Sequence, residues 1–320
     1  MAKPKMALYW AASCGGCDVA VLDTNEKILD IANLVDIVFW PIALDFKYHH
    51  VEAMADKSID LCLFNGAVRN SEQEKIARLL RNKSNVMIAF GSCACFGGIP
   101  GLANLTDRAG ILQTVYLEAP SNSNEQKTVP LTQTRVAEGE LELPELFDTV
   151  LTVEQVVPVE YFLPGCPPPV DLILKLVDLY ATGKLPPPGA VVASDKTCCD
   201  ECDRIKEDKK ITRIVRPHEI ISDPKKCFLE QGIICCGPAT RGGCGMRCVK
   251  ANMPCRGCFG PPPGVIDQGA KMLSALASIY QVNDEEGVNR LINEVLDPVG
   301  TFYRFGLPDS MLKRKRLHKA

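Results

Sequence analysis

Histidine and long apolar runs are scarce in this sequence. Its 320 residues include only four histidines, and the longest apolar stretch, residues 34–44, is interrupted by Asp36. That stretch is much shorter than the roughly 18 apolar residues that a transmembrane helix needs. An excess of charge of one sign is also missing, because 36 lysines and arginines face 39 aspartates and glutamates, for a net charge of −3. The sequence therefore predicts neither a membrane-spanning protein nor one whose main partner is nucleic acid.

The N-terminal segment lacks the features of an export signal. Lys3 and Lys5 lead directly into residues 6–10, and no long apolar segment, small-residue cleavage site or twin-arginine pair follows. We therefore expect a cytoplasmic protein. What the chain has in abundance is cysteine, with sixteen residues. In a reducing compartment that many cysteines are better explained as metal ligands than as disulfides.

Short apolar segments alternate with helical patterns in the first half of the chain. This alternation predicts an α/β fold, in which a parallel sheet has helices on both faces. Ser71, followed by Glu74, fits a capping box at the start of one helix. Residues 104–146 are polar and poorly periodic, which indicates an insertion or a long loop. The strands are expected at residues 7–10, 35–40, 61–64, 86–90 and 156–163, and the helices at residues 24–34, 71–80 and 170–182.

The composition changes after a proline-rich segment at residues 185–189, which is the best candidate for a linker. Residues 193–265 contain ten of the sixteen cysteines, and their only aromatic residues are Phe228 and Phe259. Such a segment can bury little apolar surface, and metal sites stabilise small domains of this kind. We therefore predict two domains, at residues 1–188 and 189–320, with a further helical pattern that continues through residue 295.

Four cysteines of the first half follow predicted strands. Cys14 and Cys17 follow the first strand, Cys93 follows the fourth, and Cys166 follows the last. Parallel α/β sheets form their sites at the carboxyl ends of the strands, so these loops are expected to bring four thiolates together. Four thiolates suit either zinc or a 4Fe-4S cluster. A thioredoxin-like redox pair or a zinc site is the alternative for the Cys14–Cys17 motif taken alone.

The second half offers two further sets of four cysteines, if one of each adjacent pair, Cys198/Cys199 and Cys235/Cys236, is set aside. The four cysteines predicted not to be ligands are Cys62, Cys95, Cys198 and Cys236. Three zinc sites with four cysteines each are the alternative to clusters for the whole set, although zinc ligands usually come from local paired motifs. The two sets are Cys199, Cys202, Cys227 and Cys235, and Cys244, Cys248, Cys255 and Cys258.

The cysteine motifs together resemble those of the small subunit of nickel–iron hydrogenases, over residues 8–263. The motifs concerned are Cys14-x2-Cys17, Gly91-x-Cys93 with Gly97-Gly98, Gly165-Cys166-Pro167-Pro168, Cys235-x-Gly237-Pro238 and Pro254-Cys255-x2-Cys258. The resemblance implies a flavodoxin-like domain followed by a small, irregular, cysteine-rich iron–sulfur domain. It further implies three 4Fe-4S clusters: a proximal cluster on Cys14, Cys17, Cys93 and Cys166, a medial cluster on Cys244, Cys248, Cys255 and Cys258, and a distal cluster on Cys199, Cys202, Cys227 and Cys235.

Departures from the exported members of that family indicate a subgroup. Cys199 stands where exported members usually have a histidine ligand, and Cys248 offers a fourth thiolate where they commonly hold a 3Fe-4S cluster. Ser13 replaces the usual glutamate, so a proton-transfer role for that position is not expected. The motifs around Cys244 and Cys258 look most similar to cytoplasmic, methyl-viologen-reducing hydrogenases that are linked to heterodisulfide reductase.

The expected function is electron transfer, with no catalytic residue in this chain. The resemblance implies a large subunit that contains the nickel–iron centre, and a further iron–sulfur subunit that accepts electrons, with heterodisulfide reductase as the expected link. Neither flavin nor nicotinamide is expected, because Gly242-Gly243-x-Gly245 lacks the strand–turn–helix context of a dinucleotide site. The alternatives are the cluster-bearing subunit of a respiratory NADH–quinone enzyme, which has adjacent cysteines at its first site, and a structural or binding protein stabilised by zinc.

Overall fold

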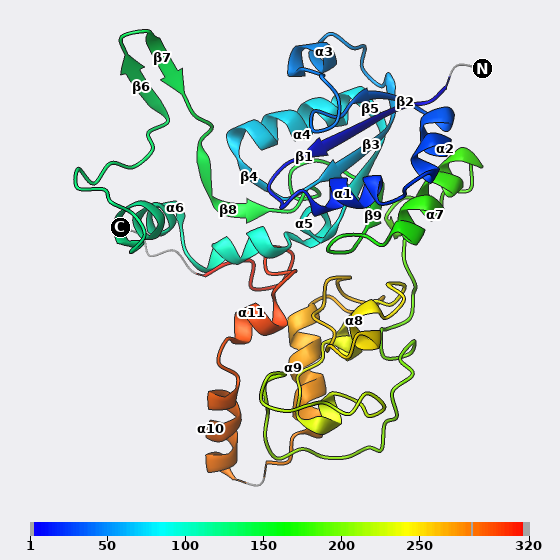
Figure 1. The fold of residues 1–320 in the computed structure, drawn as a ribbon, viewed down its shortest axis with the longest axis vertical. Helices are drawn as coiled ribbons and strands as arrows, with labels where there is room; N and C mark the ends of the chain where they lie inside the picture. Colours follow the sequence, from blue (N-terminus) through cyan, green and yellow to red (C-terminus); the bar gives the residue numbers. More distant parts are fainter. Residues whose placement is uncertain (1–2, 283, 316–320) are drawn as a thin grey trace.

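The computed structural model describes residues 3–282 and 284–315, and its centre is a six-stranded parallel sheet (Figure 1). Strand order β10-β9-β5-β3-β1-β2 places the first strand inside the sheet, with β2 on one side and β3 on the other. This is the flavodoxin-like arrangement expected from the sequence. The strands are β1 (Lys5–Trp10), β2 (Asp36–Phe39), β3 (Ile59–Asn65), β5 (Ser84–Phe90), β9 (Tyr161–Leu163) and β10 (Ala190–Val191).

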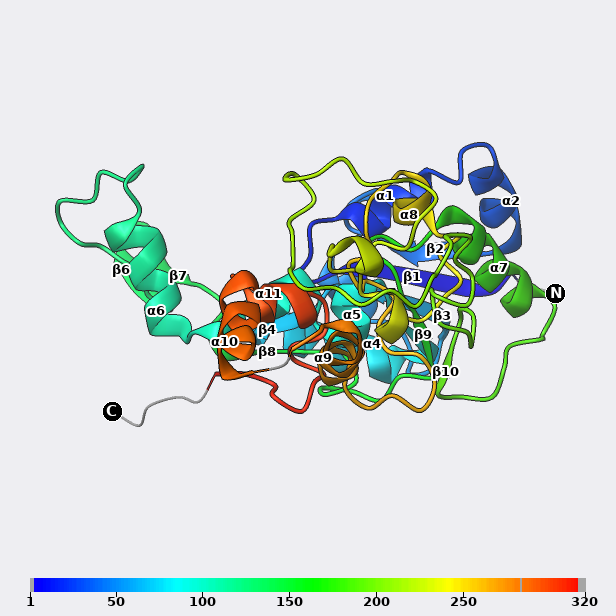
Figure 2. The same ribbon diagram turned by 90° about the horizontal axis from the view of Figure 1, so that it is seen from below.

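Helices cover both faces of the sheet, as predicted (Figures 1 and 2). Successive residues of β1 point to opposite faces of the sheet, so Leu8 lies in the hydrophobic core on one face and Tyr9 in the core on the other. The Leu8 face is covered by α1 (Gly16–Leu22), α2 (Lys27–Leu34) and α7 (Val170–Ala181). The Tyr9 face is covered by α3 (Tyr48–Glu52), α4 (Ser71–Lys83) and α5 (Ser92–Phe96).

The start of α4 differs from the capping box predicted at Ser71. Asn70 is the N-cap, and its side-chain oxygen accepts a hydrogen bond from the backbone N–H of Gln73 at 2.8 Å. Ser71 is the first helical residue, and its hydroxyl accepts from the N–H of Glu145. The reason is local: asparagine is a strong N-cap residue, and it precedes Ser71 by one position.

The segment predicted as an insertion or long loop, residues 104–146, is more ordered than a loop. It follows the 3₁₀ helix η1 (Ile99–Leu105) and projects from the sheet region as an arm (Figure 1). Every residue of its hairpin strands is exposed, so the sequence has no alternation of buried and exposed positions that could reveal them. The arm contains α6 (Arg108–Leu112), η2 (Gln113–Glu118), β6 (Gln133–Val136) and β7 (Gly139–Glu142), and β8 (Leu146–Leu151) then returns to pair with β4 (Val68–Asn70).

The cysteine-rich region, residues 193–265, lies against the carboxyl end of the sheet and has little regular structure (Figure 1). A small core around Phe228, Met272 and Tyr303 joins it to the helices that follow. The chain then returns to the sheet region, where Gly98 donates a hydrogen bond to the carbonyl of Phe305 at 3.0 Å. The elements here are η3 (Leu229–Gln231), η4 (Gly237–Ala239), α8 (Arg247–Lys250), α9 (Gln268–Ile279), α10 (Glu285–Glu294) and α11 (Pro298–Phe302).

Within residues 3–282 and 284–315, every helix is too short or too polar to span a membrane. This agrees with the short apolar runs of the sequence.

Candidate metal centres

Cys14, Cys17, Cys93 and Cys166 lie at the carboxyl edge of the sheet, as their positions after strands predicted. Cys14 is in the loop between β1 and α1, and Cys17 is in the first turn of α1. Cys93 is in the first turn of α5, directly after β5, and Cys166 follows β9. The parallel direction of β1, β5 and β9 brings the three loops to the same edge.

Two glycines leave the space that these thiols occupy. Gly91 and Gly98 have positive φ angles of 87° and 57°, which disfavour other residues. A Cβ atom on Gly91 would collide with the sulfur of Cys17, and one on Gly98 would collide with the sulfur of Cys93. The glycines of the Gly91-x-Cys93 and Gly97-Gly98 motifs therefore serve the close approach of backbone to sulfur.

Burial and neighbouring thiols raise the pKa of two cysteines at this edge, Cys17 and Cys93. Burial raises the pKa of Cys17 first, and the neighbouring thiols of Cys93 and Cys166 raise it further. Burial also raises the pKa of Cys93 to about 12, with added repulsion from Cys166 and Cys14. Cysteines from three separate loops are thus within electrostatic range of each other. Thiolates in such surroundings need adjacent positive charge, which a bound metal would supply.

Ser92 ties the loops of this edge together. Its backbone N–H donates to the carbonyl of Gly165 at 2.8 Å, and its hydroxyl accepts from the N–H of Gly165 at 3.3 Å. The same hydroxyl donates to the carbonyl of Cys258, in the cysteine-rich region. Sequence reasoning placed Ser92 only inside a cysteine motif, and no signal in the sequence indicated a contact 166 residues away.

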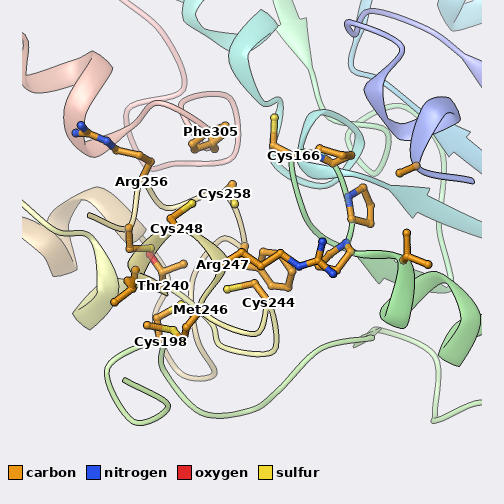
Figure 3. Close-up of a pocket in the computed structure, with 18 of the residues that line it drawn as sticks. Cys166, Cys198, Thr240, Cys244, Met246, Arg247, Cys248, Arg256, Cys258 and Phe305 are labelled. Atoms are coloured by element: carbon orange, nitrogen blue, oxygen red, sulfur yellow. The ribbon is translucent and has the colours of Figure 1, made fainter. Parts of the chain in front are cut away.

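Cys244, Cys248, Cys255 and Cys258 line one cavity of about 410 Å³ (Figure 3). Cys166 reaches the same cavity from the sheet region, so one thiol of the first set lies beside this set. Electrostatic effects agree, because the pKa of Cys258 is raised first by burial and then by Cys255, Cys166, Cys244 and Cys248. The structure therefore brings together the four residues predicted for the medial set.

Cys199, Cys202, Cys227 and Cys235 form the third group. The pKa of Cys199 is raised to about 12, mainly by burial. The Lys206 ammonium lowers this pKa, and the thiols of Cys227 and Cys202 raise it further. Cys235 lies near Cys199, because Gly237 is close to both thiols. A Cβ atom added to Gly237 would be 3.0 Å from the sulfur of Cys199 and 3.7 Å from the sulfur of Cys235. The sulfur of Cys235 also accepts a hydrogen bond from the backbone N–H of Cys255 at 3.3 Å.

The four cysteines predicted not to be ligands have different surroundings. Cys62 is fully buried within β3, and Cys95 donates to the carbonyl of Ala89 at 3.2 Å. The thiol of Cys236 points to the carbonyl of Thr301, 3.8 Å away, rather than to Cys199. Cys198 differs from these three, because it lines the same cavity as Cys244 and Cys255. The spacing of the cysteines gives no indication of where Cys198 lies.

Soft thiolates in three groups of four fit iron–sulfur clusters in donor chemistry. The collisions expected at Gly91 and Gly98 show that the backbone is closely fitted to the sulfurs. Over residues 3–282 and 284–315, no three Cys, His, Asp or Glu side chains are near enough to share a single metal ion. The fit therefore rests on converging sulfurs and on the glycines beside them.

A flavodoxin-like sheet with thiol-bearing loops at its carboxyl edge, followed by a cysteine-rich region, is the arrangement expected of a hydrogenase small subunit. A solved [NiFeSe]-hydrogenase structure from Desulfomicrobium baculatum shares this fold, with a TM-score of 0.51 and 18% identity, over 88% of this chain and 100% of that one. Residues 14–180 also match the family described as "NADH ubiquinone oxidoreductase, 20 Kd subunit".

Relatives that match over nearly the whole length narrow this class to one family. The iron–sulfur subunit of the F420-non-reducing hydrogenase of Archaeoglobus profundus is 41% identical over 97% of this chain and 98% of its own. The corresponding F420-non-reducing hydrogenase subunit of Methanothermobacter thermautotrophicus is 33% identical over 98% of this chain and 97% of its own. The chain belongs to this family of hydrogenase iron–sulfur subunits, which confirms the resemblance noted in its cysteine motifs. It is a small, electron-transferring subunit of a nickel–iron hydrogenase, and so one part of an oxidoreductase complex.

Proposed function

We propose that this chain holds three 4Fe-4S clusters and relays electrons from hydrogen oxidation, at a large nickel–iron subunit, to an acceptor linked to heterodisulfide reductase. The observation that supports this most directly is the grouping of twelve cysteines into three sets of four. The proximal set is Cys14, Cys17, Cys93 and Cys166, the medial set is Cys244, Cys248, Cys255 and Cys258, and the distal set is Cys199, Cys202, Cys227 and Cys235.

The cavity shared by Cys166 and Cys258 supports the order of these sites. A cavity lined by one cysteine of the proximal set and by all four of the medial set is what neighbouring sites would share. The backbone hydrogen bond from Cys255 to the sulfur of Cys235 then connects the medial set with the distal one. Iron–sulfur clusters supply reversible one-electron transfer when they are bound. The residues of this chain fix the positions of the sites and set their burial and hydrogen bonding.

The proximal edge is the surface that we assign to the large subunit. Cys14 and Cys166 are exposed there, although the other two proximal cysteines are buried. A partner that covers this edge would exclude water from the exposed thiolates. We further propose that the first predicted domain, residues 1–188, binds the proximal cluster, and that the second, residues 189–320, binds the medial and distal clusters. A cytoplasmic location stays a prediction from the N-terminal sequence.

Metal analysis of anaerobically purified protein tests the proposal. Three 4Fe-4S clusters require about twelve irons per chain and a brown protein. About four irons per chain would restrict the clusters to a single site. A colourless protein containing zinc would contradict electron transfer and favour a structural role for the cysteines.

A further inference from the structure

Cys198 is a buried thiol beside the medial set. It is only 1% exposed, and it lines the same cavity as Cys244 and Cys255. In Figure 3 it lies next to Thr240 and Met246, at the edge of that cavity. Its neighbour Cys199 faces the distal set instead, so two consecutive thiols serve two different sites.

The backbone holds Cys198 in this position. Its N–H donates to the carbonyl of Thr240 at 2.8 Å, and Thr197 forms an antiparallel bridge with Arg241. Arg241 is itself fixed, because its guanidinium donates to the carbonyl of Ser194 and to Asp195. The direction of the Cys198 side chain therefore follows from a paired segment of backbone and not from a free loop.

The single proton of the Cys198 thiol has a choice of acceptors. The carbonyl of Arg241 accepts it at a sulfur–oxygen distance of 3.2 Å. Cys244 and Cys255 line the same cavity as Cys198. Rotation about the Cβ–Sγ bond would turn the proton from the carbonyl of Arg241 toward their sulfurs, and no covalent bond would form or break.

We propose that Cys198 is a hydrogen-bond donor to the ligand sulfurs of the medial cluster, through Cys244 and Cys255, and that it raises the reduction potential of that cluster. This inference rests on the medial cluster proposed above. Adding an electron to a cluster increases the negative charge on its ligand sulfurs. A hydrogen bond to a charged acceptor is stronger than one to a neutral carbonyl, so the reduced state gains more from Cys198 than the oxidised state does.

The alternative role for Cys198 is that of a ligand. Two features oppose it: Cys244, Cys248, Cys255 and Cys258 already complete a set of four in this cavity, and the Cys198 thiol has a carbonyl acceptor of its own. A donor and a ligand also differ in what their loss does. Removing a donor changes the potential of a cluster that remains, whereas removing a ligand changes the cluster itself.

The experiment uses the complete hydrogenase complex, with Cys198→Ala, Cys198→Ser and the matched control Cys236→Ala. Cys236 is a buried thiol of the same region, but its acceptor is the carbonyl of Thr301. Each complex is titrated with dithionite, and the medial cluster is followed by electron paramagnetic resonance. Iron content is measured in parallel, and hyperfine spectra in D₂O report exchangeable hydrogens next to the cluster.

We expect the medial midpoint to shift to lower potential in Cys198→Ala, with unchanged iron and with loss of one exchangeable-hydrogen coupling. Serine keeps a donor at this position, so Cys198→Ser should retain the coupling and stay closer to the parent, and Cys236→Ala should match the parent. An unchanged midpoint in Cys198→Ala, with the cluster intact, overturns the inference alone. Loss of iron in Cys198→Ala would make Cys198 a ligand and also overturns it. A parent complex without a medial cluster would instead contradict the proposed function.

Discussion

The hydroxyl of Ser92 donates a hydrogen bond to the backbone carbonyl of Cys258, and so connects the proximal loop with the medial site. The two residues are 166 positions apart in the sequence. Because the same hydroxyl also accepts from Gly165, it couples the loops after β5 and β9 to the cysteine-rich region. The separation between the proximal and medial sites is thereby set by short, directional contacts as well as by packing.

Replacing this hydroxyl should loosen the junction between the two sites. In Ser92→Ala, the carbonyl of Cys258 and the N–H of Gly165 both lose a partner. Leaving buried polar groups unsatisfied costs about 1–3 kcal/mol. We expect faster hydrogen exchange at residues 163–168 and 256–260 of the complex, measured by mass spectrometry, and slower electron transfer from the proximal site.

Ser222→Ala is the matched control for this variant. Ser222 is also buried, but its hydroxyl donates to Asn252 within the cysteine-rich region. It should lower stability without altering exchange at residues 163–168. Equal exchange in Ser92→Ala and the parent would mean that the hydroxyl does not hold the junction.

Gly98 should be essential for the proximal site and not only for its turn. Gly98→Ala introduces a Cβ that collides with the sulfur of Cys93 and lies 2.7 Å from its Cα atom, so Cys93 cannot keep its position. We expect loss of about four irons per chain, with the other clusters retained. Gly183→Ala controls for backbone strain, because Gly183 has a similar φ of 64° and nothing within 4 Å of its Cβ position. Retention of the proximal cluster in Gly98→Ala would contradict this geometry.

The sheet and the proximal thiols were predictable because the signals for them are local. Strands β1, β2, β3 and β5 are short apolar runs, and each proximal cysteine follows a strand whose direction fixes the edge it reaches. The arm at residues 104–146 was not predicted as helix and hairpin, because its strands bury no face and so have no alternation of polarity.

In the second half of the chain, the spacing of the cysteines does not show which member of an adjacent pair belongs to which set. Spacing cannot decide between Cys198 and Cys199, since only the local path of the chain determines which way each thiol faces. The structure turns Cys199 to the distal set and Cys198 to the medial set. For the same reason the Ser92–Cys258 contact had no counterpart in the sequence, because it depends on how the cysteine-rich region packs against the sheet.

Cys248 should determine the type of the medial cluster. It lies in the short helix α8 and is exposed, whereas the other three medial cysteines are less so. In Cys248→Ala, the iron next to this position loses its thiolate, and we expect a 3Fe-4S cluster with about one iron fewer per chain. Electron paramagnetic resonance of the oxidised complex should then show a new 3Fe-4S signal, which the Cys62→Ala control should lack. An unchanged spectrum would show that Cys248 is not a ligand.

Cys227 should separate electron exit from hydrogen activation. It lies in the distal set, and its backbone N–H donates to the carbonyl of Ile205 at 2.9 Å, so removal of the side chain leaves this backbone contact in place. In Cys227→Ala we expect the complex to lose most of its hydrogen-dependent dye reduction, because the exit site is incomplete. Hydrogen/deuterium exchange at the nickel–iron centre of the large subunit requires no electron exit, and it should stay close to that of the parent. Both activities are measured on the same preparation, with Cys236→Ala as the control for loss of a buried thiol in this region. If Cys227→Ala abolished both activities together, Cys227 would be needed for the fold or the assembly, and the order proximal, medial, distal would lose its support at the exit.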